Sequence, residues 1–187
     1  MTKLLLSVHV LAAILAVGSI TVAASMFPRY ALQALGDGGK DGRSVGIAAL
    51  LHRVCRAYAL AGVAVPVFGI ATGAALGVLT DAWLITSLAL TTIAAALLAV
   101  AILPGQQRLL ALAQEAPAHE MNGRRTPAPE ALPQDAPAPH EPVRAVPTPE
   151  AARSAATRLT MLTGIFNVLW AVVVVLMIVR PGSTTGA

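Results

Sequence analysis

His9 lies near the start of the apolar run Leu4–Ser25 and is the one ionisable side chain clearly inside such a run. Ionisable residues within membrane segments are rare and mark functional sites by default. An imidazole there can ligate a haem or porphyrin, or can hold copper(I) together with the thioether of Met177. The structural alternative is a neutral His9 that hydrogen-bonds a hydroxyl group on a neighbouring helix. Both interpretations stay open from the sequence.

A second group of reactive side chains lies in the sequence His52-Arg53-Val54-Cys55-Arg56. Arg53 and Arg56 share a helix face, where they can bind lipid phosphates or fix the topology. Cys55 is the single cysteine, which excludes an intrachain disulfide and any multi-cysteine zinc or iron–sulfur site. At a rise of 1.5 Å per residue, His52 lies about 20–25 Å from His9 along the bilayer normal, too far for both to ligate one haem.

Membrane-spanning helices must position these candidates. Of 187 residues, 56% are hydrophobic and only 12% are charged, about half the share of soluble proteins. The composition, with 4% aromatic residues and a net charge of +4, excludes a disordered chain, a coiled coil and a nucleic-acid-binding domain. Four stretches reach the roughly 20 residues that a bilayer span needs. They are residues 4–25, 57–79, 82–103 and 159–179, the third ended by Pro104-Gly105.

The lysines and arginines predict the orientation of these spans. All thirteen except Lys3 and Arg180 fall between the first and second spans or between the third and fourth. Because positive residues stay cytoplasmic, we expect both termini outside and both long connections inside. The alternative for the first run is a cleaved signal peptide, which would leave three spans.

Residues 116–149 form a Pro-rich segment with mixed charges and almost no large apolar side chain. Such a segment cannot bury enough surface to fold, so it predicts a long disordered cytoplasmic loop. The loop separates residues 1–115, with three spans, from residues 150–187, with the fourth. We interpret His119 and His140 within it as solvated side chains rather than metal ligands.

Small and polar residues predict how the spans pack. Gly69, Gly73 and Gly77 are four residues apart on one face of the second span and predict a groove for another helix. Pro66 should kink that span. Asn167 of the fourth span should face inward. The predicted fold is therefore an all-α membrane protein, a bundle of four transmembrane helices. The residues expected to face inward are His9, Ala12, Ala16, Ser19 and Ala23 on the first span, Ser87, Thr91, Ala95 and Ala99 on the third, and Thr160, Gly164, Asn167 and Ala171 on the fourth.

Three motifs carry a family resemblance: Leu4–Ile20, Gly69–Val78 and Leu176–Gly182. The chain resembles an uncharacterised family of predicted bacterial integral membrane proteins, a domain of unknown function. That family is distantly similar to the membrane domain of copper-resistance protein D and to the HemJ-type protoporphyrinogen oxidase. The resemblance implies a four-helix inner-membrane protein, with His9 as a haem or metal ligand.

The leading functional hypothesis is a non-enzymatic, multi-pass protein of the bacterial inner membrane. It would act as a scaffold or accessory component, in a homo-oligomer or a membrane complex, with the long loop as the tether for partners. The alternative is a haem-, porphyrin- or copper-binding redox protein that uses His9. A small transporter is the third hypothesis, and nucleic acid is not expected as a partner.

Overall fold

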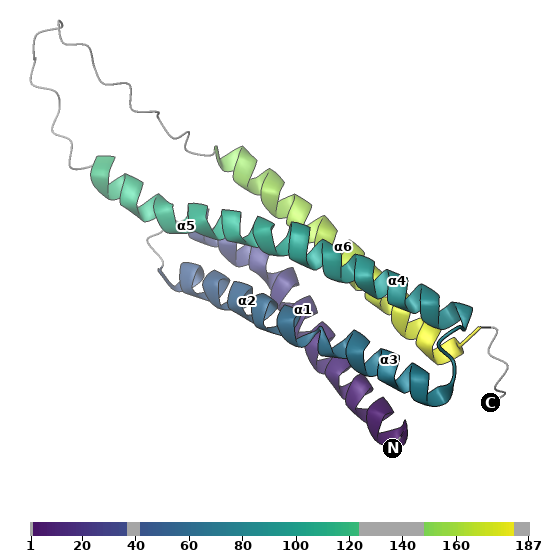
Figure 1. The fold of residues 1–187 in the computed structure, drawn as a ribbon. Coiled ribbons are helices and arrows are strands. Elements are labelled where there is room, and N and C mark those ends of the chain that lie inside the picture. The colour runs from purple at the N-terminus through teal and green to yellow at the C-terminus, as the bar shows by residue number, and fades with distance from the viewer. Residues whose placement is uncertain (1, 37–41, 124–147, 182–187) are drawn as a thin grey trace, which may run out of the picture.

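The computed structural model describes residues 2–36, 42–123 and 148–181, and within these ranges all regular structure is helical (Figure 1). Four stretches are long and apolar enough to cross a membrane, which confirms the predicted number of spans: Lys3–Gly36, Gly42–Leu76, Ala82–Glu115 and Pro149–Val179. The helices are α1 (Thr2–Gly36), α2 (Gly42–Ala61), α3 (Ala64–Leu76), α4 (Ala82–Ala96), α5 (Leu103–Gly123) and α6 (Pro149–Val179). A π-helical segment, Leu97–Ile102, joins α4 to α5.

The surface divides into an apolar belt and a polar end. Among the described residues, all exposed large hydrophobic side chains except Leu50 lie in residues 4–26, 60–100 and 161–179, which we call the belt. A helical segment of about 20 residues covers about 30 Å, the thickness of a bilayer's hydrocarbon core. Every described arginine except Arg180 lies outside the belt, in residues 27–59, 103–115 and 148–160, which we call the polar end.

The helices are longer than a bilayer requires. With 35 and 31 residues, α1 and α6 measure about 50 Å and 45 Å. Their excess length lies at the polar end, where both contact α5 and α1 also packs along α2. A continuous apolar core fills this end of the bundle, and its buried residues are Phe27, Ala31, Ala48, Leu109, Ala152, Ala156 and Leu159. The polar end is therefore a packed helical bundle that continues beyond the belt.

The opposite end of the bundle holds the start of α1, the end of α6 and the turn between α3 and α4 (Figure 1). The indole Nε1 of Trp83 donates a hydrogen bond to Asp81 Oδ2 at 3.0 Å. The guanidinium of Arg180, just past α6, lies 5.6 Å from the centre of the Trp83 ring. Tryptophan prefers the membrane–water interface, so this cluster marks the border of the belt.

The second span is interrupted between α2 and α3, at Gly62 and Val63, one turn before Pro66. Proline has no N–H to donate to the carbonyl four residues earlier, which here belongs to Gly62. That carbonyl instead accepts from the N–H of Val65 at 3.1 Å. The kink predicted from Pro66 is therefore present as a helix break.

The prediction that Pro104-Gly105 ends the third span is wrong, because α5 runs through both residues. The helix continues directly from the π-helical segment into α5, and Pro104 follows the wider turn in which the N–H of Leu103 donates to the Leu98 carbonyl five residues earlier. Gly105 is a contact point, since a Cβ there would lie 2.7 Å from Leu159 Cδ2. The helix continues to Gly123, past the predicted start of the loop at residue 116, through a stretch rich in the helix formers Ala, Gln and Glu.

The inward face predicted for α1 is confirmed, since His9, Ala16 and Ala23 are buried and Ala12 and Ser19 are half-buried. The faces predicted for the third and fourth spans are right only in part. Ser87 and Thr91 are buried as expected, but Ala95 and Ala99 are exposed, because the buried face of this helix continues through Ala94, Leu98 and Ile102. On α6 the predicted stripe is displaced: Thr160, Gly164 and Ala171 are exposed, whereas Leu159, Thr163, Phe166 and Val173 are buried. The larger apolar side chains thus form the buried face of α6.

Residues 124–147 of the predicted loop, with His140, lie outside the described residues, as does the side chain of His119.

Candidate functional site

His9 is buried in the belt, with 6% of its surface exposed. Its Nδ1 lies 2.9 Å from the backbone carbonyl oxygen of Val65, on α3. A carbonyl oxygen only accepts hydrogen bonds, so Nδ1 carries the proton that is donated. Apolar surroundings disfavour a charged imidazole, and in the uncharged ring Nε2 is an acceptor. The expected partner, a hydroxyl group on another helix, is therefore replaced by a backbone carbonyl.

Gly69 provides the space for this ring. A Cβ at position 69 would lie 3.0 Å from His9 Cε1 and 3.4 Å from Nδ1. Only the absence of a side chain lets the imidazole approach α3 closely enough to reach Val65. The residue opposite His9 on α3 is thus Gly69.

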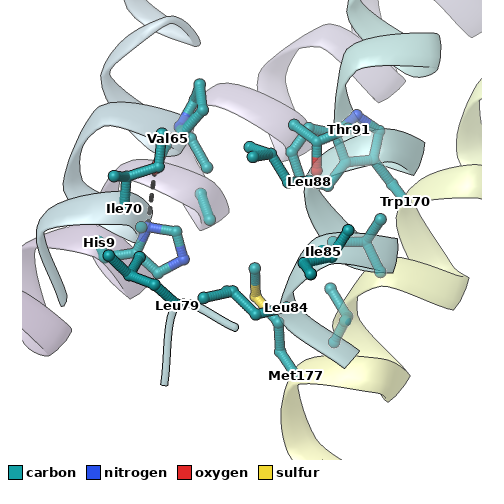
Figure 2. A pocket seen from close by; sticks show the side chains of 15 residues that line it. His9, Val65, Ile70, Leu79, Leu84, Ile85, Leu88, Thr91, Trp170 and Met177 are labelled. Atoms are coloured by element: carbon teal, nitrogen blue, oxygen red, sulfur yellow. Dashed lines mark hydrogen bonds between the residues drawn. The ribbon is translucent and has the colours of Figure 1, made fainter. Parts of the chain in front are cut away.

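His9 borders a cavity of about 100 Å³ between the pairs α1–α3 and α4–α6. Figure 2 shows the dashed Nδ1 bond to Val65 on one side of the ring and Nε2 on the side of the cavity. The other walls are mostly apolar, and Met177 extends into the space from α6 (Figure 2). A second cavity of about 120 Å³ adjoins it and shares Val65, Pro66, Thr91 and Trp170.

The residues present do not fit a porphyrin. The space at Gly69 is filled by the imidazole itself, and a Cβ at Gly73 would lie 2.8 Å from Leu84 and 3.3 Å from Leu79. The cavity is also smaller than the ~150 Å³ space that holds a single benzene ring in an engineered protein core. Copper(I) fits better, because His9 and Met177 are soft or borderline donors that line the same cavity. Among the described residues no group of three His, Cys, Asp or Glu side chains forms a metal cluster.

The other predicted packing residues have distinct positions. Gly73 is buried against Leu84 and Leu79, in the contact between α3 and the start of α4. Gly77 does not extend this face: it follows α3 with φ of 70° as its C-terminal cap, and a Cβ there would meet nothing within 4 Å. Asn167 Oδ1 accepts a hydrogen bond from Thr21 Oγ1 at 3.0 Å, which links α6 to α1.

A second buried polar cluster lies between α2 and α5. His52 Nδ1 is 3.1 Å from Gln106 Oε1, so Nδ1 donates to this amide oxygen, and Gln106 Nε2 donates to Cys55 Sγ at 3.6 Å. All three side chains are buried. Gln106 was missed by the sequence analysis because Pro104-Gly105 was interpreted as the end of the helix. Arg53 and Arg56, on the same helix as His52, are exposed at the polar end.

A comparison of the chain with protein-family models, with curated proteins and with solved structures finds no match.

Proposed function

We propose that this chain is a non-enzymatic, multi-pass protein of a bacterial inner membrane that acts as a scaffold or accessory component. The observation that carries the proposal is the polar end, where four helices continue past the belt as a packed bundle. A protein that only had to span the bilayer would need about 20 residues per helix. A rigid extension outside the membrane offers a surface to partners.

The distribution of charge supports an orientation with the polar end in the cytoplasm and both termini outside. The described arginines gather at the polar end, and positive residues remain on the cytoplasmic side. Arg53 and Arg56, exposed near the border of the belt, are suited to bind the phosphates of lipids there.

The orientation is tested with single cysteines in a Cys55→Ala background. We expect a membrane-impermeant maleimide to label Thr80→Cys, in the turn between α3 and α4, on intact cells. Gln33→Cys, exposed near the end of α1, should react only after the cells are permeabilised. The opposite pattern would reverse the orientation.

The scaffold role is tested with a photo-crosslinking amino acid at Arg53 or Arg108, both exposed at the polar end. Val175, which is 56% exposed in the belt, is the matched control that faces lipid. We expect discrete protein adducts from the two polar-end positions and none from Val175. A product of twice the monomer mass would identify a homo-oligomer, and protein adducts from neither polar-end position would contradict the proposal.

A second candidate function is copper(I) binding, favoured by the position of His9 and Met177 on one cavity. Titration with copper(I) against a competing chelator should show one site, which His9→Ala and Met177→Leu each weaken by at least tenfold. Met161→Leu is the control, because Met161 lies on the same helix but is 66% exposed. Equal affinity in all variants would rule out this site.

A further inference from the structure

His9 is buried, with 6% of its surface exposed, and its Nε2 faces a cavity (Figure 2). Within the described part of the chain, no side-chain or backbone group donates a hydrogen bond to this nitrogen. The ring is held in place by the Nδ1 bond to Val65 and by the close contact with Gly69. Buried polar groups in folded proteins almost always have a partner, so a fixed, unpaired acceptor in a cavity indicates a ligand that donates.

The rest of the cavity restricts the chemistry of that ligand. Besides His9, the polar side chains on its walls are Thr91 and Trp170, and the Thr91 hydroxyl already donates to the Ser87 carbonyl at 2.8 Å. Trp170 Nε1 is buried and lacks a hydrogen-bond partner. Because none of the described side chains that line the cavity is charged, a charged ligand would be strongly disfavoured there. The ligand should be neutral and largely apolar.

The size of the site suits one ring. The cavity of about 100 Å³ and its neighbour of about 120 Å³ share four lining residues, so the two spaces are adjacent. A cavity of ~150 Å³ holds a benzene molecule. Together the two spaces can accept an aromatic ring with a short apolar chain.

The route into the cavity leads from the lipid. Several of its lining side chains are at the same time exposed on the belt, among them Ile70, Ile85 and Leu88 at 46%, 56% and 40%. Helices α3 and α4 contact each other only weakly, because α3 packs on α1 while α4 packs on α6. A molecule dissolved in the bilayer can therefore enter between α3 and α4.

We propose that this cavity binds a membrane-soluble phenol or quinol, whose hydroxyl donates a hydrogen bond to His9 Nε2. The apolar ring contacts the aliphatic walls. An oxygen on the far side of a quinol ring would be available as an acceptor for Trp170. This binding does not depend on the scaffold function, and it requires no metal.

The test compares three probes with the purified full-length protein in detergent micelles: 4-butylphenol, 4-butylanisole and butylbenzene. Only the phenol can donate a hydrogen bond. Titration calorimetry, with empty micelles as the blank and a metal chelator present, should show that the phenol binds at least tenfold more tightly than the methyl ether. Equal affinity for all three probes, or no binding of any, would overturn the proposal without the need for a variant.

Two variants test whether the preference for the phenol depends on His9. His9→Phe should remove the preference for the phenol and still bind butylbenzene, because the ring keeps the volume but loses the acceptor. Thr86→Val is the matched control on α4, since its exposed hydroxyl donates to its own helix at Ala82. It should keep the full preference. If folded His9→Phe still binds the phenol more tightly than the methyl ether, the phenol hydroxyl must donate to another group, and the proposed role of His9 is wrong.

Discussion

The imidazole of His9 occupies the volume that a side chain at position 69 would need. The missing Cβ of Gly69 lets a large polar ring of α1 lie against the backbone of α3 and bond the Val65 carbonyl at 2.9 Å. Glycine in membrane helices commonly permits such close approach. Here the approach is made by a side chain, so one residue pair joins α1 to α3 and also fixes the cavity-facing nitrogen.

Gly69→Ala should therefore weaken the bundle. The new methyl group would displace the ring by several tenths of an ångström and strain or break the Nδ1 bond, at a cost of about 1–3 kcal/mol. Thermal unfolding in detergent, followed by circular dichroism, measures the loss. Gly18→Ala is the matched control, because a Cβ at Gly18 meets nothing within 4 Å. The control should be neutral or slightly stabilising, and equal effects of the two changes would contradict the contact.

Gly73→Leu should destabilise the protein more than Gly69→Ala. A side chain at this buried position collides with Leu84 and Leu79 and must separate α3 from the start of α4. Overpacking of this kind costs about 1–3 kcal/mol or more. Gly164→Leu places the same side chain on α6, where a Cβ has free space, and should leave the melting temperature nearly unchanged. An unchanged melting profile for Gly73→Leu would show that this contact is absent.

The bond between Thr21 and Asn167 should give a measurable coupling between α1 and α6. A double-mutant cycle with Thr21→Val and Asn167→Leu isolates this term. Interhelical hydrogen bonds in membranes average about 0.6 kcal/mol, so we expect a coupling free energy of that order. The free energies of unfolding of the four proteins supply the value, and additive single effects would mean that the bond contributes nothing.

Gln106→Leu should destabilise the polar end of the bundle. The substitution leaves His52 Nδ1 buried without its acceptor and removes the donor to Cys55. A buried polar group left unpaired costs about 1–3 kcal/mol, which thermal unfolding detects. Gln107→Leu, at the exposed neighbouring position, is the control and should have little effect. If adding His52→Leu to Gln106→Leu restores part of the stability, the unpaired histidine is the cause.

The large-scale organisation could be predicted from the sequence because hydrophobic length has a direct physical meaning in a bilayer. Four apolar runs predicted four candidate spans, and Pro66 predicted an interruption of the second span. The length of the helices was not predictable in this way. Pro28 and Arg29 interrupt the apolar run of the first span, and residues 149–158 are largely polar or alanine, yet α1 and α6 both run through these stretches.

The details of the site were less predictable, because they depend on contacts between distant residues. The acceptor for His9 is a backbone carbonyl, which carries no sequence signal. Gln106 is buried because the helix of the third span continues through Pro104. A Pro-Gly pair usually ends a helix, so the sequence predicts the opposite. On α6, small residues were expected inside, whereas Phe166 and Val173 fill the interior.

The π-helical segment Leu97–Ile102 has a consequence for the tolerance of the chain to changes in length. Its buried positions, Leu98 and Ile102, connect the inward face around Thr91 with that around Gln106. A π-type turn holds one residue more than an α-helical turn, so the segment contains a spare residue. Deletion of a single residue there would convert the segment to regular α-helix. The buried faces around Thr91 and Gln106 would both keep their orientation. The same deletion anywhere else in this helix would rotate one half by about 100° against the other.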